Sequence, residues 1–93
     1  MAVHAKDPSA AVDYSFDWAA WLTGSEQITS TSWAVEPEGE GAPVLGTVVE
    51  MGSVRGVHVS GGVRGKRYRL TCTIETDNGR TGERSLSLYV MER

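Results

Sequence analysis

The residues that could perform acid–base or metal chemistry are few, and their spacing supports no site. His4 and His58 stand far apart, and neither has a second ligand at a spacing typical of metal sites. Asp13 and Asp17 share one face of an expected strand, but at roughly 13 Å they are too far apart for a retaining carboxylate pair and wide for an inverting one. Together with Asp7 they also lack the spacing of a calcium loop. The sequence therefore predicts no catalytic, metal or cofactor site.

Nucleophiles and phosphate-binding loops give no better candidate. No serine stands in a Gly-x-Ser-x-Gly frame. The single Cys72 excludes an internal disulfide, and its place on an apolar strand face favours a buried small hydrophobe over a reactive thiol. The glycine-rich run at residues 61–66 lacks the Gly-Lys-Ser/Thr ending of a phosphate loop, and it precedes a strand rather than a helix. We therefore expect a protein that is not an enzyme.

A basic set, made up of Arg64, Lys66, Arg67 and Arg69, is the remaining polar cluster. Only Tyr68 lies among these residues, and its expected direction is inward, so a platform for stacking nucleic-acid bases is not supported. A solvated turn and outer strand face is one interpretation of the set. A protein–protein contact, in which Arg is favoured, is the other.

Composition indicates one small domain without a membrane or nucleic-acid partner. The 93 residues are 40% hydrophobic, which is enough for a single core, and the net charge of −3 gives no argument for nucleic acid. No apolar run approaches the roughly 20 residues that span a bilayer. The N-terminus has no apolar stretch of signal-peptide length, so we expect synthesis in a cytoplasm.

The charges are distributed unevenly along the chain. Residues 1–50 carry one lysine against eight acidic residues, and residues 51–93 carry eight basic residues against four acidic ones. Opposite ends of the domain could therefore differ in sign, which would favour head-to-tail docking of like subunits. Alternatively, strands from the two halves interleave and the charges average out.

The clearest structural signal is a hairpin over residues 66–91. Apolar residues alternate with polar ones on both sides of an Asp-Asn-Gly-Arg turn, which is the pattern of a half-buried antiparallel hairpin. The expected inward residues are Tyr68, Leu70, Cys72, Ile74, Leu86, Leu88 and Val90.

Four further strands are expected at residues 12–18, 27–35, 44–51 and 54–60. In the second of these, Trp33 and Val35 share a face and Ile28 lies on the other. At most one short helical turn is expected, near residues 18–22, and Trp18, Trp21 and Trp33 are expected to be interior anchors. The predicted fold is an all-β, immunoglobulin- or fibronectin-like antiparallel sandwich of about six or seven short strands, over residues 11–93. Residues 1–10 are expected to form an extended arm that includes Lys6, Asp7 and Pro8.

Tyr68 admits two interpretations. It stands at the start of a late strand after a glycine-rich turn, where the hydroxyl of a tyrosine corner bonds back to the preceding turn. It could equally be a core aromatic with no such role.

Several phrases of the sequence together resemble one family. They are Lys6-Asp7-Pro8, the block at residues 13–22 with its Asp-Trp-x-x-Trp-Leu, the serine/threonine strand ending in Trp33, the strand at residues 68–74, and Gly79-Arg80-Thr81. This combination resembles the immunoglobulin-like fibre–tail adaptor proteins of tailed phages and prophages. The resemblance covers nearly the whole chain and is weakest over residues 36–62.

The resemblance implies a non-enzymatic structural role in the tail region of a virion made in a bacterial host. It implies partners among the tail, connector or fibre proteins, and several copies arranged as a ring-like homo-oligomer. We expect the arm and the basic set to supply contacts, with the arm reaching a neighbouring subunit. The alternative is a carbohydrate- or host-surface-binding sandwich, which would expose aromatic residues on its loops.

Overall fold

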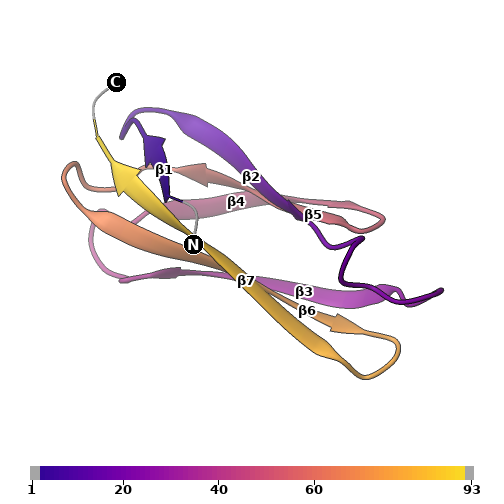
Figure 1. The fold of residues 1–93 in the computed structure, drawn as a ribbon. Helices are drawn as coiled ribbons and strands as arrows, with labels where there is room; N and C mark the ends of the chain where they lie inside the picture. Colours follow the sequence, from indigo (N-terminus) through magenta and orange to yellow (C-terminus); the bar gives the residue numbers. More distant parts are fainter. Residues whose placement is uncertain (1–2, 92–93) are drawn as a thin grey trace.

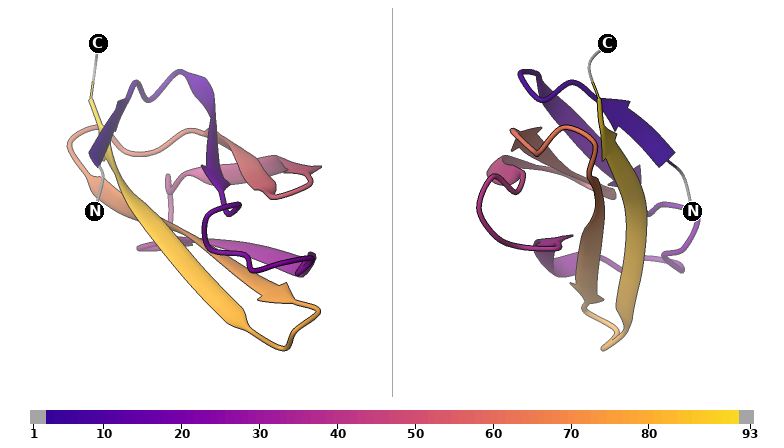
Figure 2. Two further views of the ribbon diagram at one scale, coloured as in Figure 1. Left: turned by 45° about the vertical axis from the view of Figure 1, so that its right-hand side comes forward. Right: turned by 90° about the vertical axis from the view of Figure 1, so that its left-hand side faces the viewer.

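The computed structural model describes residues 3–91, which form seven strands in two facing sheets and no helix (Figure 1). The strands are β1 (Val3–Lys6), β2 (Ala11–Asp17), β3 (Ile28–Glu36), β4 (Val44–Met51), β5 (Val54–Ser60), β6 (Arg67–Thr76) and β7 (Thr81–Val90). One sheet has the order β1-β7-β6-β3 and the other β2-β5-β4, and Figure 2 shows them as two layers. The predicted all-β sandwich is confirmed, and β7-β6-β3 facing β2-β5-β4 is the strand order of an immunoglobulin domain.

The predicted hairpin forms β6 and β7. Tyr68 lies opposite Leu88 and Leu70 opposite Leu86, so the apolar residues of both strands face the second sheet. Gly79 in the connecting turn has a φ of +77°, a left-handed conformation that favours glycine. The Tyr68 side chain is buried, and its hydroxyl accepts a hydrogen bond from the Val63 backbone N–H at 3.1 Å. The hydroxyl of this buried tyrosine therefore bonds back to the preceding turn, as the tyrosine-corner interpretation predicts.

Stacked aromatic rings join the two sheets near the middle of the sandwich. Phe16 of β2 stacks on Trp33 of β3 with 6.1 Å between ring centroids, and Trp33 pairs in register with the buried Cys72. Immunoglobulin domains of antibodies place a tryptophan against an inter-sheet disulfide at this level. Here Cys72 is a free, buried cysteine, and burial raises the pKa of its thiol to about 11.

The structure corrects one expectation about β3. Ile28 was expected on the face opposite Trp33, but a register shift between Ile28 and Ser30 turns it inward. Ile28 packs against the cluster of Trp18, Cys72 and Ile74. A bulge reverses the facing of every residue on one side of it, so alternation alone misplaces Ile28.

The expected arm is partly a strand. Within residues 3–6 it pairs in parallel with β7, with Val3 opposite Ser87 and Lys6 opposite Val90. This parallel pair departs from the predicted antiparallel sandwich. Met1 and Ala2 of the arm, and Glu92 and Arg93 at the other end, lie outside the described residues.

Residues 18–27 connect the end of β2 in one sheet to the start of β3 in the other (Figure 1). The Leu22 backbone N–H donates to the Trp18 carbonyl at 3.0 Å, which makes a single helical turn at the predicted place. Trp18 is buried and contacts Trp21 edge to face. Both rings lie over Gly82 of β7, where an added Cβ would come within 2.9 Å of Trp18 and 3.1 Å of Trp21.

We expect Gly82→Ala to destabilise the protein by about 1–3 kcal/mol, because the new methyl group overlaps two rigid indole rings. Gly46→Ala is the matched control, since an added Cβ there meets its nearest atom at 3.6 Å. The control should change the free energy of unfolding by less than about 0.5 kcal/mol. Urea denaturation followed by tryptophan fluorescence measures both, and equal effects would show that the tryptophans do not depend on Gly82.

Candidate interaction surfaces

The end of β1 is bound within its own chain. The Lys6 side chain is only 1% exposed. Its Nζ donates to the Gly61 carbonyl at 2.7 Å and to the Asp7 carbonyl at 3.0 Å. Burial lowers the pKa of this amine, against a smaller opposing effect of the Asp7 carboxylate. Asp7 and Pro8 are half-buried and therefore more exposed than Lys6. Contacts of these three residues with another protein stay a prediction.

Residues 18–27 are fastened to the β6–β7 hairpin by a buried glutamate. The Glu26 carboxylate accepts hydrogen bonds from the Thr76 hydroxyl at 2.6 Å and from the Thr23 backbone N–H at 3.0 Å. Arg80 Nε donates to Glu26 Oε2 at 2.9 Å, and its guanidinium also forms an ion pair with Oε1. The same guanidinium donates to the Trp21 carbonyl at 2.9 Å and lies 3.9 Å from the centre of the Trp21 ring.

The contacts in this cluster favour the charged forms of both Glu26 and Arg80. The Arg80 guanidinium and then the Thr76 hydroxyl hold the pKa of the Glu26 carboxyl well below its usual value, although burial works in the opposite direction. The Glu26 carboxylate in turn raises the pKa of Arg80. Four residues after Arg80, on β7, the Arg84 guanidinium stacks 4.5 Å from the Trp18 ring centre and donates to the Asp17 carbonyl. The tryptophans are therefore held between the core and two arginines.

The four basic residues predicted as a contact surface are all exposed. Arg67 lies over the Tyr89 ring at 5.4 Å, and Arg69 Nε donates to the Ser85 hydroxyl at 3.2 Å. Because Arg67 pairs with Tyr89 and Arg69 with Ser87, the two arginines share the outer face of the β6–β7 pair. Their role in binding a partner stays a prediction.

Acidic and basic segments meet at this end of the sandwich. Glu36 at the end of β3 pairs in register with Arg69. In the loop at residues 37–43, a Cβ added to Gly41 would come within 2.7 Å of the Val63 side chain in the basic turn. The charges of the two halves of the chain therefore mix here, as the interleaved alternative predicts.

The two histidines lie in different surroundings. His58 Nδ1 is 2.6 Å from Asp13 Oδ1, an exposed pair between β5 and β2. His4 packs edge to face against Tyr14, with 5.6 Å between ring centres. Within residues 3–91 no three His, Cys, Asp or Glu side chains gather in a way that could hold a metal ion. Over the same residues, no helix is long and apolar enough to cross a membrane.

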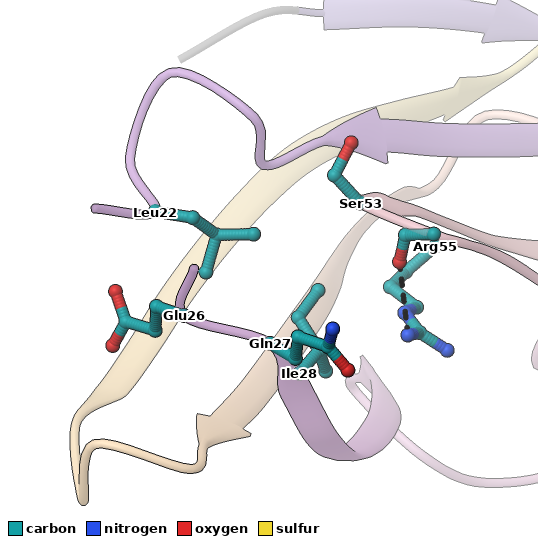
Figure 3. Close-up of a pocket in the computed structure, with 7 residues that line it drawn as sticks. Leu22, Glu26, Gln27, Ile28, Ser53 and Arg55 are labelled. Atoms are coloured by element: carbon teal, nitrogen blue, oxygen red, sulfur yellow. Dashed lines mark hydrogen bonds between the residues drawn. The ribbon is translucent and has the colours of Figure 1, made fainter. Parts of the chain in front are cut away.

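A pocket of about 310 Å³ opens at the end of the sandwich between residues 22–28 and the β4–β5 turn (Figure 3). Glu26 belongs to its wall, but its carboxylate points away from the side where Arg55 lies. The Arg55 side chain is 12% exposed. It donates to the Gly52 carbonyl at 3.0 Å and lies 3.4 Å from the Glu50 carboxylate. Its Nε finds no hydrogen-bond partner among the described residues.

The alternation of residues in β5 indicates that Arg55 points inward, although a charged side chain is usually exposed. Arg55 stands at period two with Val57 and Val59, which are core residues of β5. Among the residues that line the pocket, Glu26 is the only carboxylate and Arg55 the only cation. The Glu26 carboxylate is bound to Arg80, so this lining holds no pair of groups arranged for proton transfer.

A family model described as "Podophage GP4 fiber-tail adaptor protein gp77" matches residues 6–89. The chain belongs to this fibre–tail adaptor family. The family suggested by the sequence phrases is thus confirmed. A search of curated proteins returned no match. In this adaptor, the distinctive Asp-Trp-x-x-Trp-Leu phrase spans residues 17–22. It forms the end of β2 and the turn that follows, and its first tryptophan, Trp18, is buried.

We expect Glu26→Gln to lower the free energy of unfolding at pH 7. We also expect this free energy to fall less steeply as the pH is lowered. The ordinary glutamate pKa is 4.5, and the folded state lowers it. The stability from this shift is fully present above pH 4.5 and is lost as the pH falls toward the folded-state pKa. Urea midpoints measured from about pH 7 to about pH 2.5 should therefore fall less steeply for the variant than for the native protein.

Glu83→Gln is the matched control, because Glu83 is an exposed glutamate on β7. This control should keep the acid dependence of the native protein. A Glu26→Gln variant with the native slope would show that the Arg80 pair does not govern the acid response.

Proposed function

We propose that this adaptor is a non-enzymatic structural protein that joins tail and fibre components of the virion through protein–protein contacts. The observation that carries the proposal is the family match, which spans the sandwich from the last residue of β1 to the penultimate residue of β7. The proposal places the protein in the tail region of the particle, in several copies arranged as a ring, after synthesis in the host cytoplasm.

The surface features support a docking role. Arg67 and Arg69 of the basic set lie on the outer face of the four-stranded sheet, braced by Tyr89 and Ser85, and Arg64 and Lys66 are exposed in the turn before β6. Arginines of this kind, held in place by a neighbour, lose little conformational entropy on binding and are favoured at interfaces. The glycan-binding alternative calls for exposed aromatics on loops. All three tryptophans are instead buried or half-buried, and Trp18 and Trp21 are covered by arginines.

The direct test is a phage that lacks this chain, complemented or not with the native gene. Without the protein, particles should carry tails but no fibres, as seen by electron microscopy and by quantitative mass spectrometry. A phage that lacks its fibre protein is the reciprocal control, and its tails should still contain the adaptor. Normal fibre numbers in the absence of the chain would overturn the proposal.

We expect the double variant Arg67→Glu, Arg69→Glu to fold normally and to lose most of its binding to purified tails. The charge reversal replaces both braced cations on the outer face of β6, and exposed charges there contribute little to stability. Glu83→Arg is the control, because it reverses an exposed charge at the other end of the same face. Co-sedimentation with tails at two salt concentrations measures the effect. Equal binding by the native protein and the double variant would remove the basic set from the interface.

A further inference from the structure

The four sheet edges of the sandwich are not equally protected against pairing with another chain. β1 is only four residues long. β2 carries the exposed charges of Asp13 and Asp17. β3 contains a register shift near its start and presents mostly hydroxyl side chains. Short length, charges and bulges are the devices by which natural proteins prevent edge pairing.

The edge formed by β4 also has a register shift, between Leu45 and Val48, and one exposed charge, Glu50, but most of its exposed side chains are large and apolar. Val44 is 62% exposed, Val48 51%, Val49 38% and Met51 71%. These are most of the large exposed hydrophobic residues of the described chain, and they lie on one eight-residue strand. An exposed apolar edge of this kind marks an interaction site or an aggregation hazard.

The exposed side chains occupy both faces of β4. Val48 pairs in register with the core residue Val57, so it points between the sheets and is nevertheless half exposed. Val49 pairs with Gly56 and Met51 with Val54, on the outer face. From Val48 to Met51 the register with β5 is regular. An additional strand would therefore continue the sheet and cover apolar groups on both faces at once.

The charges around β4 define what such a strand should carry. The loop that leads into β4 contains Glu38 and Glu40 after Glu36, and all three are exposed. Glu50 lies within the strand with half of its side chain exposed, whereas Arg55, which lies 3.4 Å from its carboxylate, is only 12% exposed. Pairing of two β4 strands in antiparallel fashion would bring the acidic loop of each copy to the Glu50 end of the other. A second copy of this chain is therefore disfavoured, and a basic segment is favoured.

We propose that β4 is the docking edge for an extended segment of another virion protein, which adds to the sheet as an antiparallel strand. The segment has apolar residues at alternate positions and lysine or arginine at its C-terminal end, which lies beside the acidic loop because the strands run in opposite directions. Main-chain hydrogen bonds supply affinity, and the valines and glutamates supply selectivity. That the partner is a virion protein rests on the proposed function. The exposed apolar residues of β4 and the acidic residues around it do not depend on that function.

The first experiment compares amide hydrogen exchange of the adaptor free in solution and assembled in purified tails. Backbone amides of residues 44–51 should exchange at least about tenfold more slowly in the particle, whereas those of the β3 edge at residues 28–36 should change less. Unchanged exchange of β4 in particles that contain the adaptor would overturn this inference and leave the proposed function intact.

The second experiment uses matched variants. Val49→Lys should reduce incorporation into tails by at least about tenfold, because a charge replaces an apolar residue at the edge. Met91→Lys is the control, since Met91 is 39% exposed against 38% for Val49 and follows β7 of the other sheet. Thermal unfolding shows that both variants are folded. Equal incorporation of the two variants would overturn the proposal.

A third arm works without particles, so it also decides the matter if the adaptor is absent from tails. The probe is a synthetic peptide with eight alternating valine and threonine residues and two C-terminal arginines, and its control ends in two glutamates. The arginine peptide should bind the purified protein at least about tenfold more tightly, and Glu38→Lys with Glu40→Lys should remove the difference. Equal binding of the two peptides, or dimerisation of the free protein that Val49→Lys abolishes, would overturn the proposal.

Discussion

The pairing of Glu26 with Arg80 is the constraint that closes this sandwich. Residues 18–27 cross from one sheet to the other without a strand ladder. Single backbone hydrogen bonds hold their two ends, at Trp18 and Gln27, and side-chain bonds hold the stretch between. The Glu26 carboxylate gathers Thr23, Thr76 and Arg80, and Arg80 reaches on to the Trp21 carbonyl and ring. A buried ion pair adds little net stability compared with apolar packing, but it specifies one arrangement. The start of β3, the seating of Trp18 over Gly82 and one wall of the pocket all follow from that arrangement.

Local periodicity in the sequence is enough to predict most of the strands. Alternation over residues 68–74 and 86–90 identifies the inward face, because each residue contributes a side chain to one face or the other. The inward face of β3 fails at Ile28, since a bulge adds a residue that no spacing rule announces. The immunoglobulin-like class follows from the number of strands and the turns between them, and the family phrases agree with it.

The contacts that join distant parts of the chain are what the sequence does not reveal. Glu26 and Arg80 are separated by more than fifty residues, and nothing in either neighbourhood marks the other as a partner. Lys6 reads as an exposed arm residue, but the Gly61 carbonyl and the Asp7 carbonyl hold its amine inside. An edge strand and a central strand have the same local pattern, because edge position depends on the order of strands. The valines of β4 therefore look like core residues until the sheet order places β4 at an edge, with no further strand beside it among residues 3–91.

The parallel pairing of β1 with β7 has a consequence for how the chain is built on the ribosome. The sheet β2-β5-β4 needs only residues 11–60, so it can form while the rest of the chain is still being made. The sheet β1-β7-β6-β3 requires its first and last strands to meet, with the Met91 N–H donating to the Lys6 carbonyl. The start of the chain must therefore wait for residues 81–91 to emerge before it finds its place. Until then Lys6 remains hydrated, and the exposed edges of the first sheet are open to neighbouring nascent chains.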